Sequence, residues 1–215
     1  MNIKRLLFPP KCVFCSRILT DDEQHICTSC AEGLRKQKPP SKRSGAFFDA
    51  AYSFLPYSGT VRRAIHRYKY YGKIHYADYF ASLMAIRYGR EEKTLPDIIT
   101  AVPSHRRKAA KRGFDHSFLL AQKVGERLGI EPSRLLKKLE ATPAMYGLKA
   151  EQRRANIRGS IGFMSDAEQI KGKHILLIDD IFTTGSTAAE CARVLKNFGA
   201  KRVTVLVAAM TVKKK

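Results

Sequence analysis

Residues 174–187 read His-Ile-Leu-Leu-Ile-Asp-Asp-Ile-Phe-Thr-Thr-Gly-Ser-Thr. The apolar run from His174 to Ile178 is typical of a buried strand, and it delivers two adjacent carboxylates, Asp179 and Asp180, at its carboxyl end. A turn of hydroxyl residues and glycine follows, and a helix is predicted to begin after it. Ligands of open α/β sheets bind at such strand ends, so this run predicts a ligand site.

The turn has the chemistry of a phosphate site. The start of a helix offers unpaired N–H groups and the positive end of the helix dipole. Gly185 lets the backbone approach a ligand closely. Further donors come from the hydroxyls of Thr183, Thr184, Ser186 and Thr187.

The acid pair needs a separate explanation, because two carboxylates repel a lone phosphate. A sugar phosphate accounts for them if its ribose hydroxyls donate to Asp179 and Asp180. A Mg²⁺ ion that holds a diphosphate is a second possibility, since hard cations take carboxylate oxygens. Capping of the following helix is a third, although it explains one carboxylate at most.

The rest of the chain predicts an α/β fold with a twisted parallel sheet flanked by helices. Apolar runs separated by helical patterns of ten residues or more are typical of βαβ units. The predicted strands are 50–55, 98–102, 174–178 and 203–209, and the predicted helices are 60–71, 78–88, 117–129 and 186–198.

Four cysteines near the N-terminus have the spacing of a zinc site. Cys12 and Cys15 form one CxxC pair, Cys27 and Cys30 form another, and eleven residues separate the pairs. Two such knuckles can offer four thiolates to one tetrahedral Zn²⁺, which leaves no open position for catalysis. Disulfides are the competing interpretation, and they fit poorly in a reducing compartment. We therefore expect a structural zinc finger over 1–35, a polar linker over 36–46 and the α/β domain over 47–215.

The chain is strongly basic. Forty Lys and Arg residues stand against nineteen Asp and Glu, for a net charge of +21. Such a field attracts polyanions, of which nucleic acid is the first candidate, although a basic surface can also serve solubility or a small phosphorylated ligand.

Residues 50–77 concentrate this charge. They contain five cations, no acid and seven interleaved aromatic residues, which is the composition that single-stranded nucleic acid requires. The competing interpretation is that several rings belong to the core, and we expect this of Tyr52 and Phe54. The cations are Arg62, Arg63, Arg67, Lys69 and Lys73, and the other rings are Tyr57, Tyr68, Tyr70, Tyr71 and Tyr76.

The run from Ile178 to Thr187 resembles the phosphoribosyl-pyrophosphate (PRPP) motif of type I phosphoribosyltransferases. The resemblance implies that Asp179 and Asp180 face the ribose hydroxyls, that residues 183–187 bind the 5-phosphate, and that Mg²⁺ accompanies the diphosphate. Ser104 and Arg106, which follow a predicted strand, lie where this family places its pyrophosphate loop. Five cations between Arg106 and Arg112 are candidates for a lid over that site, or for contacts with DNA phosphates.

Further segments resemble the ComF family of competence proteins. They are Lys69-Tyr-x-x-Lys73, Arg112-Gly-Phe-Asp115-His116, Arg153-Arg-x-Asn156-Ile157 and the four-cysteine finger. The resemblance covers almost the whole chain and adds Lys69 and Arg112 to the candidate PRPP-binding residues. Two positions depart from the family pattern: Asp115 stands where Asn is usual, and Met145 lies where a Gln is usual.

The ComF resemblance implies a role in natural transformation, with single-stranded DNA and competence helicase-like and DNA-processing proteins as partners. Transfer of phosphoribosyl to an acceptor is not implied by the motif, so an enzyme and a binding protein both remain open. The alternative is a conventional phosphoribosyltransferase with a small-molecule acceptor and no DNA role. The short apolar stretches predict no membrane insertion and no export, and hence a cytoplasmic protein.

Overall fold

A four-stranded parallel sheet forms the centre of the protein, whose structure is a computed structural model that describes residues 9–104, 113–139 and 159–212. Its central strands are near-continuous apolar runs, because helices cover both faces of the sheet. In sheet order the strands are β1 (Ala50–Pro56), β6 (Arg202–Met210), β5 (His174–Phe182) and β2 (Ile98–Ala101).

Two apolar clusters sandwich the sheet. Along β5, Leu176 and Ile178 belong to the cluster with α3, α4 and α6, while Ile175 and Leu177 belong to the cluster with α8. This alternation follows from the two-residue period of a strand. The four helices are α3 (Gly59–Tyr70), α4 (Tyr76–Glu91), α6 (His116–Leu128) and α8 (Ser186–Asn197).

The predicted strands and helices are confirmed, with shifts at their ends. The largest shift concerns β5, which extends to Phe182 and pairs Asp179 with Val207, so both acids lie within the strand. Local patterns did not predict three short elements, namely α2 (Thr28–Lys36) and the antiparallel pair β3 (Leu136–Lys138) and β4 (Ile161–Phe163). A 3₁₀ turn, η1, spans Ala167–Gln169.

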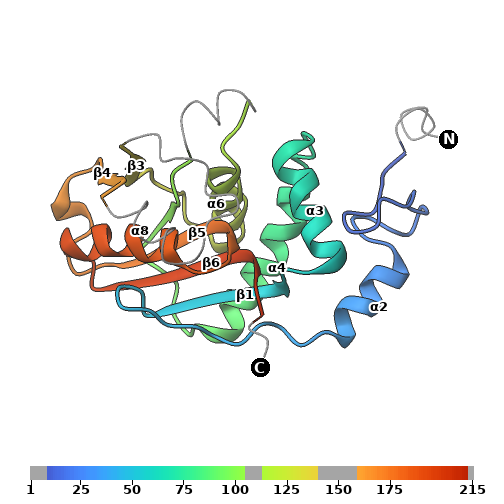
Figure 1. Cartoon of the computed structure of the whole chain (residues 1–215), viewed down its shortest axis with the longest axis horizontal. Coiled ribbons are helices and arrows are strands. Elements are labelled where there is room, and N and C mark those ends of the chain that lie inside the picture. Colours follow the sequence, from blue (N-terminus) through green and yellow to red (C-terminus); the bar gives the residue numbers. More distant parts are fainter. Residues whose placement is uncertain (1–8, 105–112, 140–158, 213–215) are drawn as a thin grey trace.

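The cysteine-bearing segment packs against α3 and α4, on the side away from the β3–β4 pair (Figure 1). Phe14 inserts its ring edge-on against Tyr79 and Phe80 of α4, with centroids 5.9 and 6.5 Å away. The Arg67 guanidinium of α3 donates to the carbonyls of Val13 and Phe14, both at 2.8 Å. The cysteine knuckle is thus tied to the α/β domain by its backbone as well as by apolar contacts.

The segment predicted to be a linker also makes an ordered contact. The backbone of Arg43 exchanges two hydrogen bonds with Ala51 of β1, an isolated antiparallel bridge at the edge of the sheet. Among the described residues, no helix combines the length and apolar character needed to cross a bilayer.

Candidate functional site: an acid pair beside an uncapped helix

The acid pair lies at the carboxyl end of β5, where α3 and α6 supply its partners. Asp180 is 6% exposed, and its carboxylate pairs with the Lys69 ammonium of α3 at 2.8 Å. The Asp179 carboxylate accepts from the Ser117 hydroxyl of α6 at 2.9 Å and from the backbone N–H of Asp180 at 2.8 Å. Three elements far apart in sequence therefore meet at two adjacent carboxylates.

The protonation of Asp179 is unusual. Burial, together with the neighbouring Asp180 carboxylate, raises the pKa of Asp179 to about 7, although Lys69 and the two hydrogen bonds act in the opposite direction. Burial would lower the pKa of Lys69, but the Asp180 carboxylate outweighs it, and the pKa is raised. Asp179 thus titrates near neutral pH, so a cation that favours its ionised form displaces a proton.

The turn predicted to bind phosphate, residues 183–187, directly follows β5. Gly185 has φ 80° and is the N-cap residue of α8, so the N-cap position offers no side chain to this helix. The Thr184 hydroxyl accepts weakly from the Ser186 N–H at 3.4 Å. A Cβ at Gly185 would lie 2.3 Å from the Phe182 ring, so only glycine fits here. The hydroxyls of Thr184 and Ser186 lie 2.9 Å apart at the helix start. The uncapped N–H groups and these hydroxyls suit an anion. Neither acid of β5 caps the helix.

Arg43 and Thr211 hold this turn by contacts to the Thr183 carbonyl. The Arg43 guanidinium lies 3.5 Å from the Thr183 carbonyl and also donates to the Thr211 carbonyl. The Thr211 hydroxyl donates to the same Thr183 carbonyl at 3.0 Å. Sequence reasoning missed Arg43, Ser117 and Thr211 because each acts across a long chain separation, and no local pattern marks them.

Ser104 and Asp115 form a second junction near the site. The Ser104 hydroxyl donates to Asp115 at 2.8 Å, and Asp115 caps α6 by accepting from the Phe118 N–H at 3.3 Å. Asp and Asn are about equally good N-caps, so Asp115 supplies the same cap that the family's usual Asn would. Arg134 lies 3.3 Å from the second Asp115 oxygen and stacks 3.6 Å from the Phe118 ring centroid.

The remaining candidate residues divide into two groups. Lys69 is brought to the acid pair, while Arg106 and Arg112, and with them the hypothesis of a cationic lid, lie outside the described residues. So do Met145 and the Arg153–Ile157 segment. The structure places His116 in the interior, 3% exposed, where its Nε2 lies 2.8 Å from the Lys69 carbonyl.

The four cysteines converge as their spacing predicts. The sulfurs of Cys12, Cys15, Cys27 and Cys30 all lie within 4.8 Å of one another. The Sγ atoms of Cys15 and Cys27 are 3.6 Å apart, close to the ~3.8 Å edge of a tetrahedron with Zn–S bonds of about 2.3 Å. The Cys27 N–H approaches the Cys12 sulfur at 3.4 Å, as in many thiolate sites. This donor set fits a structural Zn²⁺, which would hold together a segment with little apolar core of its own.

His25 does not join this cluster. Its ring lies against Tyr79, with centroids 5.5 Å apart, and its Nε2 is 3.7 Å from an Asp78 carboxylate oxygen. The four sulfurs therefore suffice as ligands.

Family comparisons agree with both halves of this architecture. Residues 117–215 match the family described as "Phosphoribosyl transferase domain", and residues 3–55 match the "Double zinc ribbon domain". The chain therefore combines an N-terminal segment similar to double zinc ribbons with a domain of the phosphoribosyltransferase type of fold. The predicted fold class is confirmed.

Relatives that span most of the chain narrow this class. "DNA utilization protein YhgH" of Escherichia coli O157:H7 is 28% identical over 93% of this chain and 96% of the relative. "Competence protein F" of Haemophilus influenzae is 25% identical over 91% of this chain and 82% of the relative. Among solved structures, glutamine PRPP amidotransferase from B. subtilis is 20% identical, and the match covers 61% of this chain and 26% of the amidotransferase chain, with a TM-score of 0.42. The two sequence relatives that span most of the chain make it a homologue of the DNA utilization and competence F proteins, and the resemblance to the ComF family is confirmed.

Proposed function

We propose that this protein binds PRPP, or a related phosphoribosyl ligand, with Mg²⁺ at the Asp179–Asp180 pair, and that it does so in the cytoplasm as part of DNA uptake. The observation that carries the proposal is the juxtaposition of two carboxylates with an uncapped helix start on one strand–turn–helix unit. A sugar phosphate needs both features, because its hydroxyls donate to carboxylates while its phosphate accepts from N–H groups.

In this proposal each residue has a defined task. Asp179 and Asp180 accept from the ribose hydroxyls, while residues 183–187 receive the 5-phosphate. Mg²⁺ supplies charge neutralisation on the diphosphate and takes oxygen ligands. Lys69, 2.8 Å from Asp180, balances one negative charge before the ligand arrives. Lys69 is also proposed as a ligand for its phosphates. Ser104, Arg106 and Arg112 are proposed for the pyrophosphate side.

A decisive test is calorimetric titration of PRPP and Mg²⁺ into the zinc-loaded protein and into the Asp179→Asn/Asp180→Asn variant. The wild type should bind and the variant should not. Asp166→Asn/Glu168→Gln is the matched control, because it replaces two exposed carboxylates elsewhere by the corresponding amides. Equal binding by all three proteins, or no binding by the folded wild type, contradicts the proposal.

The DNA role is proposed on the homology to competence and DNA utilization proteins, together with the net charge of +21. We propose single-stranded DNA as the contact, with competence helicase-like and DNA-processing proteins as partners. A conventional phosphoribosyltransferase with a small acceptor is the alternative. Pyrophosphate release with candidate acceptors, in the absence of any oligonucleotide binding, would support that alternative.

A further inference from the structure

The cations on and after α3, which the sequence presents as one basic stretch, have different tasks in the structure. Arg67 is committed to the zinc ribbon through the carbonyls of Val13 and Phe14. Lys69 is committed to Asp180. Arg62, Arg63 and Lys73 are exposed and remain for a ligand outside both of these contacts.

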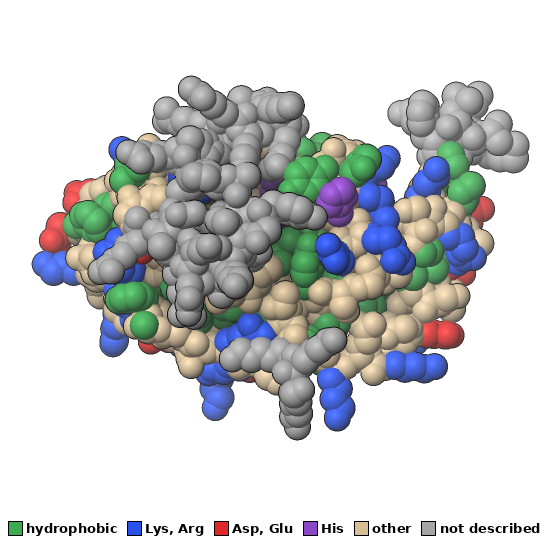
Figure 2. All heavy atoms as spheres, viewed as in Figure 1, with side chains coloured by type: hydrophobic (Ala, Val, Ile, Leu, Met, Phe, Trp, Pro, Cys, Tyr) green, Lys and Arg blue, Asp and Glu red, His purple; other side chains and the backbone are tan. Residues whose placement is uncertain are grey.

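These three cations surround a groove. It has a volume of about 690 Å³ and is lined by Gly59, Arg62, Arg63, His66, Arg67, Tyr71 and Lys73. Figure 2 shows the corresponding face, where hydrophobic and His side chains lie beside Lys and Arg over α3. No acidic residue occurs between residues 50 and 77, so no carboxylate within this stretch competes for the cations.

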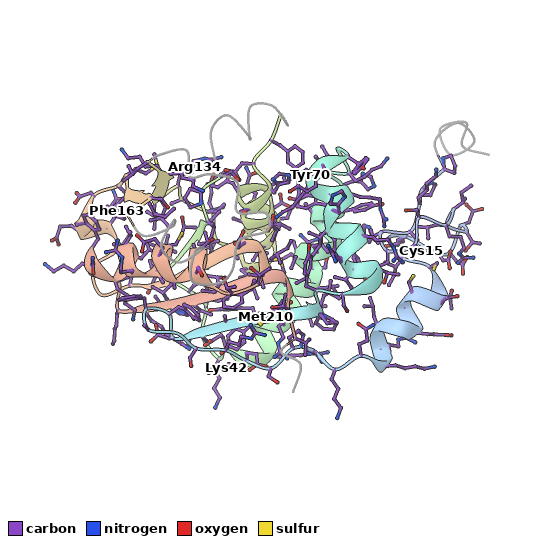
Figure 3. All side chains as sticks on the ribbon, viewed as in Figure 1. Cys15, Lys42, Tyr70, Arg134, Phe163 and Met210 are labelled. Carbon is purple, nitrogen blue, oxygen red and sulfur yellow. The ribbon has the colours of Figure 1, made fainter. Side chains whose placement is uncertain are left out.

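Two aromatic rings, His66 and Tyr71, line the same groove, and the Tyr70 ring lies beside His66. The His66 ring lies 4.7 Å from the Tyr70 ring and 5.6 Å from the Tyr71 ring, measured between centroids. Tyr70 and Tyr71 are 54% and 65% exposed, whereas Tyr52, Tyr68 and Tyr76 of the same stretch are buried. Figure 3 shows Tyr70 at the upper end of α3, with Cys15 on the far side of that helix. Exposed rings beside exposed cations are what stacked bases and their phosphates require.

We infer that this groove, the α3 groove, binds single-stranded nucleic acid, with bases stacked on Tyr70, Tyr71 and His66 and phosphates held by Arg62, Arg63 and Lys73. The inference rests on the proposed DNA contact and assigns it to particular residues. A duplex would use the cations but could not offer its base faces to the rings, and an acidic peptide would not need three rings. The phosphoribosyl site is not part of the groove, because Lys69 points to Asp180.

Two variants separate the roles of rings and cations. Tyr70→Ala/Tyr71→Ala should weaken binding of a labelled oligothymidine about tenfold or more, because stacking is lost, while the slope of log affinity against log salt stays unchanged. Arg62→Gln/Arg63→Gln should make that slope shallower by about 1.4, at about 0.7 for each phosphate contact on a single strand. Lys173→Ala/Lys201→Ala, which removes two exposed charges away from α3, should leave the slope near the wild-type value.

Fluorescence anisotropy at several salt concentrations measures both quantities, with a duplex and an RNA of the same length as comparison ligands. RNA that binds as DNA does would extend the site to single strands in general. The inference is overturned if the tyrosine variant binds as the wild type does, if the Lys173/Lys201 control lowers the slope as much as the arginine variant, or if the duplex shows the same dependence on the tyrosines. PRPP titration of the same variants keeps the two proposals apart, because the α3 variants should retain PRPP binding.

Discussion

Replacement of Asp179 by Asn should stabilise the protein increasingly as pH rises. Burial and the Asp180 carboxylate raise the pKa of Asp179 to about 7 from its ordinary value of 3.8. The folded state therefore binds more protons than the unfolded state between these values, and this carboxyl lowers stability as pH rises. The expected slope is about 1.4 kcal/mol per pH unit, with a total of about 4 kcal/mol.

The amide introduced by Asp179→Asn has no titratable proton, so this pH-dependent loss disappears in the variant. Its Oδ1 can still accept from the Ser117 hydroxyl and the Asp180 N–H, as the carboxylate does. The difference in unfolding free energy between variant and wild type should then grow by about 1.4 kcal/mol per pH unit from about pH 5 to pH 7 and level off above it. Stability is gained while the proposed ligand is lost, as is usual for groups held in place for binding.

Urea unfolding of the zinc-loaded proteins at several pH values measures this difference, and contributions of the zinc site cancel between the two proteins. Asp180→Asn is the matched control. It leaves the Lys69 ammonium without its partner in a site where its side chain is 22% exposed, so this variant should be less stable than the wild type at neutral pH. Parallel stability curves for the wild type and Asp179→Asn between about pH 5 and 7 would refute the reasoning.

Three further outcomes are expected. Gly185→Ala should lower the free energy of unfolding, measured by thermal unfolding, by about 2 kcal/mol or more, because the new Cβ clashes with the Phe182 ring and the backbone is left-handed. Gly172→Ala should cost less, because Gly172 has a similar φ of 72° but open space around it. Chelation of zinc, and separately Arg67→Ala, should both lower the melting temperature, because the contact between Arg67 and the knuckle carbonyls is lost. Chelation should also weaken binding in the α3 groove, measured by anisotropy, because the knuckle carbonyls orient α3. Asp115→Ala should cost about 1 kcal/mol of unfolding free energy, while Asp115→Asn should cost much less.

Each of these three predictions would be contradicted by a specific result. Equal losses for the two glycine variants would mean that the Phe182 contact is not what excludes a side chain. Unchanged oligonucleotide affinity after chelation would separate the zinc ribbon from the α3 groove. Equal stability of the Ala and Asn variants at position 115 would show that the cap contributes little.

Local patterns were enough for the β5 turn and the cysteine pairs. Two acids after an apolar strand, followed by hydroxyls and Gly185, specify a strand–turn–helix unit from neighbouring residues alone, although Arg43 and Thr211 hold the turn from distant positions. The CxxC spacing likewise limits four sulfurs to one small volume. The end of this strand was harder to predict, because β5 stays paired with β6 as far as Phe182.

Functional assignment of the basic stretch needed long-range contacts. Arg62, Arg67 and Lys69 are all cations of the same stretch and cannot be told apart by charge. In the structure Arg62 is exposed beside the rings, Arg67 binds the zinc ribbon and Lys69 pairs with Asp180. Helical periodicity places Val61, Ala64, Ile65 and Tyr68 in the core, but the partner of each outward residue depends on what packs next to α3.

The parallel α/β fold, the zinc ribbon and the acidic turn thus follow from short-range sequence pattern, because strand and helix periods and metal-ligand spacing are local properties. The tertiary structure was needed for the rest: Lys69 against Asp180, Ser117 against Asp179, Arg43 beneath the turn and Arg67 on the knuckle. These partners are separated in the chain by between 53 and 168 residues. Only the packing of helices on the sheet brings such distant residues within hydrogen-bonding distance.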